Sequence, residues 1–340
     1  MSFRDEAELE EFMSRPSAAD VAAMAALDGD LLVLGAAGKM VPTLARRAQR
    51  AVKQAGAKVR VIGVSRFSDA GAKQKIEAAG VETITAELLD REQLARLPDA
   101  PNIIYMAGRK FGSTGAEYLT WAMNALLPAM VAERYPRSRI VAFSSGNVYA
   151  FSPVSRGGSR EEDTLDPVGE YGWSVLARER VFDHYSRANG TPVTLLRLNY
   201  AIDMRYGVLL DIGTKVYEKR PVDVKMGHAN VVWQGDANSI ALQTVARCAS
   251  PPFVLNLTGP ETLSVREVAL QFGEIFGEKP QFTGQEAENA LLNNAGRCWE
   301  MFGPPAVTTR EMIEWTAAWI RAGGPTLSKP THFEARDGKF

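Results

Sequence analysis

The sequence has 340 residues, enough to bury a substantial core as one large domain or as a domain with a smaller partner. Its net charge is −1 with both signs interspersed, so it offers no basic stripe to a nucleic-acid backbone. No apolar run approaches the roughly 20 residues that a membrane span requires, and the acidic segment 4–11 lacks the apolar core of a signal peptide. We therefore expect a cytoplasmic protein with no nucleic-acid and no membrane partner.

The amino-terminal half alternates between short apolar runs and amphipathic stretches. The run 31–34 (Leu-Leu-Val-Leu) is continuously apolar, as in a strand buried on both faces. The pattern then predicts, in order, a helix at about 40–52, a strand at 59–64, a helix at 70–79, a strand at 81–84, a helix at 91–97, a strand at 102–106, a helix at 115–134, a strand at 139–143, a helix at 171–187 and a strand at 193–198. This alternation predicts an α/β fold with a doubly wound parallel sheet of the dinucleotide-binding Rossmann type.

Changes in this pattern predict four segments. Residues 1–28 form an N-terminal helical extension of two short helices, and residues 29–203 form the Rossmann domain. Short strands and helices mix over 204–322, as expected for a smaller α+β substrate lid, and we expect chain segments to cross between lid and Rossmann domain. Residues 323–340 predict an extended C-terminal arm.

The first strand runs into a glycine-rich turn, Gly35-Ala36-Ala37-Gly38-Lys39-Met40-Val41. Glycines at a strand-to-helix turn let the backbone approach a pyrophosphate, whose charge is met by the amino terminus of the helix. The residues expected to contact a dinucleotide here are Gly35, Ala37, Gly38, Lys39 and Met40. Val41 replaces the usual third glycine, and we expect it to move the helix slightly off the sheet without abolishing binding.

The end of the second strand bears on the choice of dinucleotide. A site that prefers NAD usually has an acidic residue there, which binds the adenosine ribose, whereas this chain has Ser65-Arg66. A serine followed by an arginine suits a 2′-phosphate, so we predict NADP, with NAD as the alternative. The other interpretation of Arg66 is a solvated loop residue.

Two motifs further along the chain are more specific. They resemble the strand-end and active-site-helix motifs of the extended short-chain dehydrogenase/reductase superfamily, particularly its NAD-dependent epimerase/dehydratase family. The strand-end motif is Val141-Ala142-Phe143-Ser144-Ser145-Gly146-Asn147-Val148-Tyr149, and the helix motif is Tyr171-Gly172-Trp173-Ser174-Val175. The resemblance spans roughly residues 30–320. It implies that Ser145 and Tyr171 are catalytic, and that Tyr171 also lies against the cofactor.

Other positions match the same family. Asn124 resembles its structural asparagine, Glu87-Leu88 resembles the acidic-Leu pair beside the adenine, and Ala107-Gly108 resembles the backbone that passes the nicotinamide ribose. The resemblance therefore implies that these five residues are part of the cofactor site. The family analogy also allows a homodimer.

One position departs from the family's Tyr-x-x-x-Lys motif, because Val175 stands where the lysine is expected. That lysine holds the nicotinamide ribose and lowers the tyrosine's pKa from its usual value of about 10. Position 175 lies one helical turn beyond Tyr171, so we expect its side chain to point along the same face toward the cofactor. Arg178 follows on that face and is interpreted as a surface or structural ion-pair residue.

These observations favour an NAD(P)-dependent oxidoreductase or epimerase that acts on a sugar, sugar acid or sugar nucleotide, with Tyr171 as acid/base and Ser145 holding the reacting oxygen. Two other interpretations stay open: a dinucleotide-binding sensor or regulatory protein that lost turnover with its lysine, and a dehydratase with a tightly held cofactor. The candidate substrate contacts are Arg109, Lys110, Asn199, Arg205, Tyr206 and His228. Cys248 and Cys298 lack the spacing of a metal site or a disulfide framework, so we expect reduced thiols and no metal.

Overall fold

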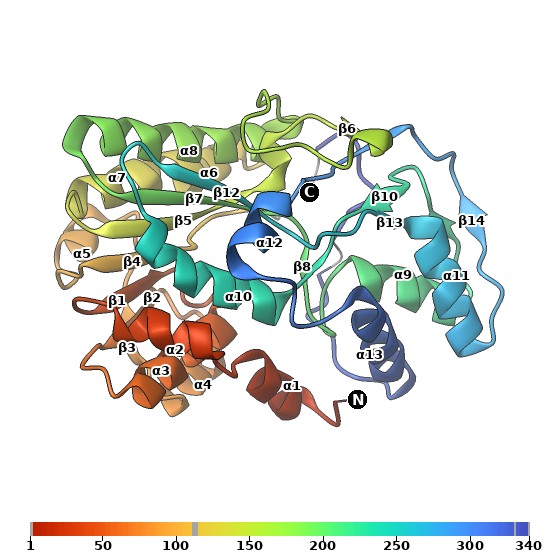
Figure 1. Ribbon diagram of the computed structural model, residues 1–340, viewed down its shortest axis with the longest axis horizontal. Coiled ribbons are helices and arrows are strands. Elements are labelled where there is room, and N and C mark those ends of the chain that lie inside the picture. The colour runs from red at the N-terminus through yellow and green to blue at the C-terminus, as the bar shows by residue number, and fades with distance from the viewer. Residues whose placement is uncertain (1–2, 111–114, 330, 339–340) are drawn as a thin grey trace.

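The computed structural model describes residues 3–110, 115–329 and 331–338. Its centre is a sheet of parallel strands in the order β3-β2-β1-β4-β5-β7-β12 (Figure 1). These strands are β1 (Leu31–Leu34), β2 (Val61–Ser65), β3 (Glu82–Thr85), β4 (Asn102–Tyr105), β5 (Arg139–Ser145), β7 (Val193–Leu198) and β12 (Phe253–Leu257). The sheet confirms the expected doubly wound fold. Its last strand comes from the part of the chain beyond residue 204.

Helices cover both faces of this sheet, which explains why all four residues of β1 are fully buried (Figure 1). One face packs against α2 (Ala18–Ala25), α3 (Val41–Ala55), α4 (Ala70–Ala78), α10 (Gln234–Gln243) and α12 (Gly296–Phe302). The other face packs against α5 (Arg91–Ala95), α7 (Leu127–Arg134) and α8 (Gly169–Asn189). The helices of the described residues include none with the length and apolar content of a membrane span.

The helix expected over 115–134 is interrupted in its middle. The structure has α6 (Glu117–Trp121), a π-helical turn over Ala122–Leu126, and then α7. Single wide turns of this kind often occur at functional sites. Here the turn carries Asn124, whose side chain is fully buried and contacts the candidate site described below.

A second core lies beyond the carboxyl edge of the sheet and forms the lid. Its main helices are α9 (Val208–Tyr217), α11 (Val265–Phe276) and α13 (Thr309–Arg321), at the right of Figure 1. Short strand pairs join the lid segments to one another and to the loop after β5: β8 (Ala201–Ile202) with β11 (Val232–Trp233), β9 (Val222–Asp223) with β14 (Phe282–Thr283), β10 (His228–Ala229) with β13 (Leu263–Ser264), and β6 (Ser152–Pro153) with β15 (Asn289–Ala290). Short pairs of strands thus hold the segments of this second core together beside the sheet.

The N-terminal helices connect the two cores. The first helix, α1 (Glu6–Met13), buries Leu9 and Met13 in the lid core, whereas α2 packs against α3 under the sheet. A buried ion pair between Asp20 and Arg47, at 2.7 Å, fixes α2 to α3. The extension thus holds the lid and the Rossmann layer together.

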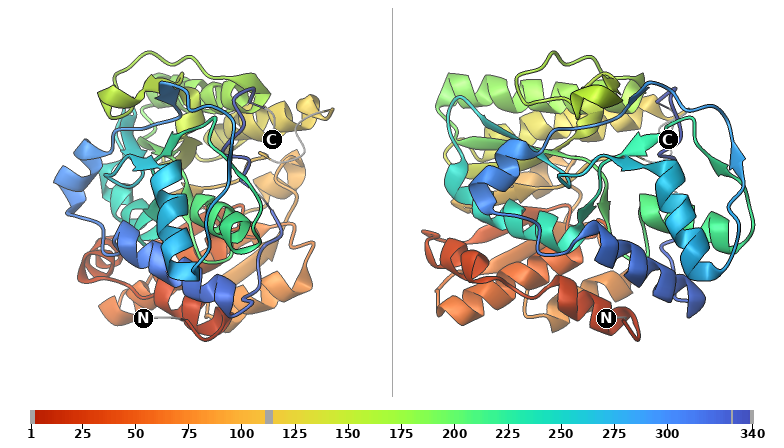
Figure 2. Two further views of the ribbon diagram at one scale, coloured as in Figure 1. Left: turned by 90° about the vertical axis from the view of Figure 1, so that its right-hand side faces the viewer. Right: turned by 45° about the vertical axis from the view of Figure 1, so that its right-hand side comes forward.

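The C-terminal segment packs against the lid instead of projecting from it. After α13 the chain runs back across the lid to the opposite side of the molecule (Figure 2). The Leu327 amide donates to the Arg205 carbonyl at 3.0 Å, and the Thr331 amide donates to the Asp211 carboxylate at 2.9 Å. Phe333 is only 1% exposed. We call residues 323–338 the C-terminal strap, and Thr331 places it against the cavity described next.

Candidate active site

The carboxyl ends of β1, β4, β5 and β7 open into a cavity of about 260 Å³ between the sheet and the lid. The strand order reverses here, because β1 pairs with β2 on one side and with β4 on the other. Doubly wound sheets bind their ligands at such a switch point. The described residues that line it come from residues 38–41, 106–110, 143–147 and 198–207, with Tyr171 and Arg178 from α8, Gln234 from α10 and Thr331 from the C-terminal strap.

The glycine-rich turn after β1 has the shape that a pyrophosphate requires. Gly35 has a φ of 93°, and a Cβ there would lie 2.7 Å from the Ala107 amide nitrogen, so the turn touches the backbone after β4. Among the described side chains, none caps the amino end of α3. The Val41 amide donates to the Gly38 carbonyl at 3.2 Å and Pro42 has no N–H, so this helix end offers an anion fewer backbone donors than an ordinary one. The close backbone approach at Gly35 is the feature that the turn shares with a phosphate-binding turn.

A buried hydrogen-bond network stands behind the loop after β4. The Asn124 side-chain NH₂ donates to the Arg109 carbonyl and to the Ser174 hydroxyl, both at 2.9 Å. Its amide oxygen accepts from the Arg109 amide at 2.9 Å and from Arg178 Nη2 at 2.7 Å. A Cβ on Gly108 would collide with the same guanidinium, so this glycine lets the loop pass directly over Arg178.

The hydroxyl groups of Ser145 and Tyr171 meet in this cavity. Ser145 ends β5, and its Oγ donates to Asn147 Oδ1 at 2.9 Å while it accepts from the Asn147 amide at 3.2 Å. Burial raises the pKa of Tyr171, while the charge of Arg178 and a hydrogen bond with Ser145 act in the opposite direction. The net shift is upward, so Tyr171 is protonated at neutral pH.

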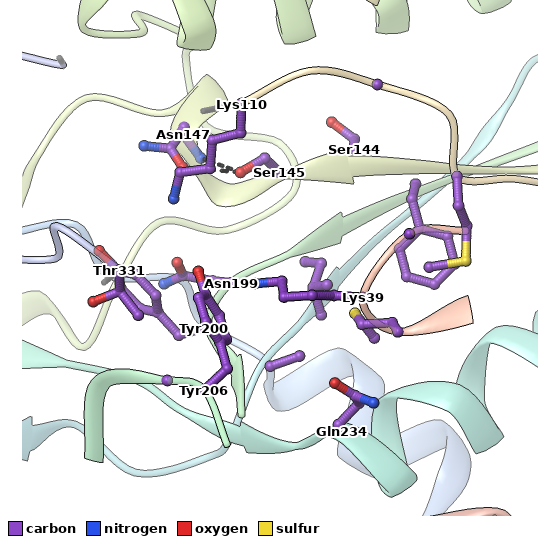
Figure 3. A pocket seen from close by; sticks show the side chains of 18 of the residues that line it. Lys39, Lys110, Ser144, Ser145, Asn147, Asn199, Tyr200, Tyr206, Gln234 and Thr331 are labelled. Atoms are coloured by element: carbon purple, nitrogen blue, oxygen red, sulfur yellow. Dashed lines mark hydrogen bonds between the residues drawn. The ribbon is translucent and has the colours of Figure 1, made fainter. Parts of the chain in front are cut away.

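Two lysine side chains enter the cavity from different loops (Figure 3). Lys39 Nζ lies 2.7 Å from the centre of the Tyr206 ring, and Lys110 Nζ lies 5.7 Å from the centre of the Tyr171 ring. Burial and the charge of Lys110 lower the pKa of Lys39 to about 6, and burial lowers the pKa of Lys110 to about 8. Lys39 is therefore the cation most easily neutralised here.

The sequence pattern of the NAD dependent epimerase/dehydratase family matches residues 31–202, half of the chain. The chain belongs to this family. Membership confirms the resemblance inferred from the Ser145 and Tyr171 motifs, identifies the chain as an enzyme of this class, and makes its cofactor a nicotinamide dinucleotide. No curated protein sequence matches the chain at a significant level.

Solved structures of epimerases share the fold. UDP-glucose 4-epimerase from Thermotoga maritima, in a structure with UDP-glucose, superposes with a TM-score of 0.68 at 16% identity over 86% of this chain and 99% of its own. UDP-glucuronic acid 4-epimerase from Bacillus cereus, in complex with NAD, superposes with a TM-score of 0.70 at 17% identity, over 86% of this chain and 98% of its own. An epimerase from Methanothermobacter thermautotrophicus superposes with a TM-score of 0.70 at 18% identity, over 89% of this chain and 96% of its own. At these identities the likeness shows the fold alone.

The family lysine position does not line the cavity in this epimerase/dehydratase family member. Val175 is fully buried in an apolar cluster with Val148, Tyr149 and Leu176, and it is not among the lining residues. Tyr171 packs against the same cluster. The expectation that position 175 points toward the cofactor stays a prediction.

Arg178 does not lie at the surface, one of the two positions that the sequence suggests for it. It is 6% exposed and lines the cavity. Seven residues fall about 20° short of two full turns, so position 178 shares the face of Tyr171 more closely than position 175 does. Besides Asn124, the guanidinium donates to the Phe143 carbonyl at 2.7 Å.

Some of the candidate substrate residues line the cavity and others lie outside it. Arg109, Lys110, Asn199 and Tyr206 line the cavity. Arg205 does not, since its guanidinium is bound to Asp203 at 2.9 Å and to the Glu10 and Glu6 carboxylates of α1 at 2.8 and 3.1 Å. It ties the N-terminal extension to the lid.

His228 also lies outside the cavity, on β10, where it pairs with Ser264 of β13 in the lid. Its assignment to the substrate is not supported by this position. The sequence assigns no role to several of the lining residues, among them Asn147, Tyr200, Gln234 and Thr331. Asn147 could have been found, since it lies in the same strand-end motif as Ser145, whereas Thr331 carried no signal.

The remaining cofactor candidates lie beyond the cavity, at the carboxyl ends of β2 and β3. Ser65 ends β2, and Arg66 follows with a largely exposed side chain. Arg66 Nη1 lies 3.5 Å from Glu87 Oε2, and Leu88 beside it is buried. The two positions assigned to the adenosine half, after β2 and after β3, are thus neighbours in space.

Proposed function

We propose that this protein is an NAD(P)-dependent oxidoreductase or epimerase that acts on a sugar, sugar acid or sugar nucleotide, in the cytoplasm. The observation that supports it is the pair of Ser145 and Tyr171 hydroxyls in a cavity beside the phosphate-binding turn. The nicotinamide supplies the hydride acceptor and donor when it is bound. Tyr171 exchanges a proton with the reacting hydroxyl of the substrate, and Ser145 donates a hydrogen bond to the same oxygen.

Proton transfer by Tyr171 requires a nearby cation, because burial raises its pKa above the usual value. We assign this task to Arg178, which reaches the Tyr171 side of the cavity and is held in place by the Phe143 carbonyl and Asn124. It acts through the tyrosine and is a positioning residue. The nicotinamide ribose would pass over Gly108, next to the same guanidinium.

The experiment that tests this proposal combines binding with turnover. The protein is titrated with NADP and NAD, and the loaded protein is incubated with UDP-sugars and sugar acids while epimer formation and NAD(P)H are measured. We expect turnover by the wild type. Gly38→Glu should lose dinucleotide binding, because a carboxylate at the turn opposes the phosphates. A Gly38→Glu variant that binds as tightly as the wild type would refute the assignment of the turn.

The main alternative is a sensor that binds dinucleotide without turnover. The burial of Val175 and the raised pKa of Tyr171 favour it, since both disfavour phenolate formation. Redox-dependent dinucleotide binding without conversion of any sugar would select this function. Conversion of a sugar without net change in NAD(P)H, and with loss of water, would select a dehydratase.

We also propose NADP as the preferred cofactor, supported by Arg66 at the end of β2. A contact between Arg66 and a 2′-phosphate is charge-assisted, so Arg66→Ala should weaken NADP about tenfold or more and leave NAD nearly unchanged. Glu87→Gln should strengthen NADP, because Glu87 now competes for Arg66. Arg60→Ala is the matched control, since Arg60 pairs with Asp30 at the opposite end of β2. Equal losses of NAD and NADP in Arg66→Ala would exclude this assignment.

We further propose a homodimer that packs through α6, the π-helical turn and α8. These adjoining elements expose Tyr118, Leu126 and Trp173, which are 73%, 50% and 47% exposed. Large apolar side chains gathered on neighbouring helices suit an interface between copies. Sedimentation velocity at micromolar concentration distinguishes a dimer from a monomer, and a monomer would contradict this proposal.

A further inference from the structure

The cavity holds two lysines to which the proposed chemistry at Ser145 and Tyr171 assigns no task. Lys39 enters from the turn after β1 and Lys110 from the loop after β4 (Figure 3). We infer that Lys39 and Lys110 together bind an anionic group, a carboxylate or a phosphate, which the sugar carries near its reacting hydroxyl. This inference rests on the proposed function, since it specifies the substrate of the same site.

The positions of the two ammonium groups separate them from the phosphate-binding turn. Lys39 belongs to that turn, but its side chain extends across the cavity to the ring of Tyr206, at the lid side (Figure 3). Lys110 lines the same cavity as Asn147, and its Nζ is 5.7 Å from the centre of the Tyr171 ring. Both groups therefore stand beside the residues that would contact a sugar.

The charge of the lining residues supports an anionic ligand. Among the described residues of the lining, Lys39, Arg109, Lys110 and Arg178 are basic and none is an Asp or a Glu. Two ammonium groups in one cavity repel each other, and this repulsion adds to the burial that lowers the pKa of Lys39. An anion between them removes that repulsion and favours the charged form of both lysines. A neutral sugar offers no such compensation.

The other charged groups near Lys39 belong to the lid and the C-terminal strap. Asp203, Asp211 and Lys329 act on its charge in addition to Lys110, and the ring of Tyr206 lies against its ammonium group. Asp203 binds Arg205 at 2.9 Å, and Asp211 accepts from the Thr331 amide at 2.9 Å. The two carboxylates are thus already engaged in holding the lid and the strap.

The test compares ligands that differ in one anionic group. NADP-loaded protein is titrated in a calorimeter with UDP-glucuronate against UDP-glucose, and with glucuronate and glucose 6-phosphate against glucose. Since both nucleotide sugars carry the same diphosphate, their difference reports the sugar carboxylate, and the free sugars distinguish carboxylate from phosphate. We expect the acidic member of at least one pair to bind about tenfold more tightly, as for a charge-assisted contact.

Lys39→Met and Lys110→Met should each remove most of this preference, because methionine keeps the chain length and apolar contacts without the charge. Lys58→Met, in the exposed loop between α3 and β2, is the matched control and should keep it. Thermal unfolding and the far-UV circular dichroism spectrum, measured on each variant, report a misfolded protein separately.

Protonation of Lys39 provides a second readout. An anion raises the pKa of Lys39 from about 6, so binding near neutral pH takes up a proton, and affinity falls as the pH rises above that value. Titration in buffers of different ionisation enthalpy measures this uptake, which should disappear in Lys39→Met.

Equal affinity for the acidic and neutral sugars in every pair, or a preference that survives in both lysine variants, would overturn the inference while leaving the proposed function intact. NADP binding without binding of any sugar would overturn both. Loss of turnover in Tyr171→Phe together with an unchanged preference for the acidic sugar would support the two proposals separately.

Discussion

Replacing Tyr171 with Phe is expected to lower kcat by about 10²- to 10⁴-fold, the usual contribution of a positioned acid/base. The hydroxyl is the group that exchanges a proton with the substrate, and it shares a hydrogen bond with Ser145. Phenylalanine keeps the ring in place, so dinucleotide affinity and thermal stability should change little. The measurement is kcat and KM for the sugar identified by the ligand screen, alongside NADP titration.

The pH profile of the wild type supplies an independent check. Burial raises the pKa of Tyr171, so the phenolate needed to abstract a proton forms only above the usual range of tyrosine. Activity in the direction of oxidation should therefore increase toward alkaline pH. Ser145→Ala should cost less than Tyr171→Phe, because it removes one hydrogen bond and not the proton donor.

Tyr185→Phe is the matched control for this experiment. Tyr185 also lies on α8, but its hydroxyl donates to Glu133 at 2.7 Å on the far part of the helix. Its loss should leave kcat unchanged. Full activity in Tyr171→Phe would mean that the family mechanism does not operate in this protein, and the sensor function would then become the better proposal.

The sheet and its glycine-rich turn could be predicted because local sequence determines them. A continuous apolar run such as 31–34 is compatible with few structures other than a doubly covered strand. Gly35 adopts a backbone conformation that other residues rarely take, and it touches the next loop of the sheet. These constraints act over a few residues, so the sequence displays them directly.

The direction of side chains on α8 could not be predicted with the same certainty. Val175 and Arg178 are three residues apart, and the difference between facing the cavity and facing an apolar cluster is a rotation of the helix by a fraction of a turn. That rotation depends on packing against the sheet and the loop after β4, which are distant in sequence. A motif places a residue on a helix, but tertiary contacts decide what it faces.

Contacts in the lid could not be predicted either, because they join residues that are far apart in the sequence. Arg205 follows β8 at the position expected for a substrate contact, yet the carboxylates of Glu6 and Glu10, 199 and 195 residues away in the sequence, bind it. Thr331 reaches the cavity because the strap returns across the lid. Neither contact leaves a periodic pattern in the sequence.

Arg178→Met tests whether Arg178 takes the place of the missing lysine as the cation that assists Tyr171, or has only a structural task. If Arg178 is the cation that assists Tyr171, its loss should move the alkaline limb of the pH profile of kcat upward by about one unit or more, since one unit of pKa is about 1.4 kcal/mol of interaction. It should also destabilise the fold, because the Phe143 carbonyl and the Asn124 amide oxygen each lose a hydrogen bond from a charged donor, worth about 1.5–3 kcal/mol. The Asn124 oxygen keeps its bond from the Arg109 amide.

A purely structural arginine would produce the second effect without the first. Arg178→Lys therefore accompanies Arg178→Met: the lysine restores a positive charge but cannot make both hydrogen bonds, so it should recover the pH profile more fully than the stability. Arg187→Met is the control on the same helix, because Arg187 pairs with Asp183 at the surface and should affect neither readout.

A lysine introduced at position 175 provides a further test of the task assigned to Arg178. A lysine introduced there would enter the cluster of Val148, Tyr149 and Leu176, against which Tyr171 packs, and desolvation would disfavour its charged form. Val175→Lys in the Arg178→Met background should consequently lose further stability and leave the alkaline limb where Arg178→Met placed it. Recovery of the neutral-pH activity by that lysine would show that position 175 can face the cofactor after all, and that Arg178 serves the loop after β4 and not the tyrosine.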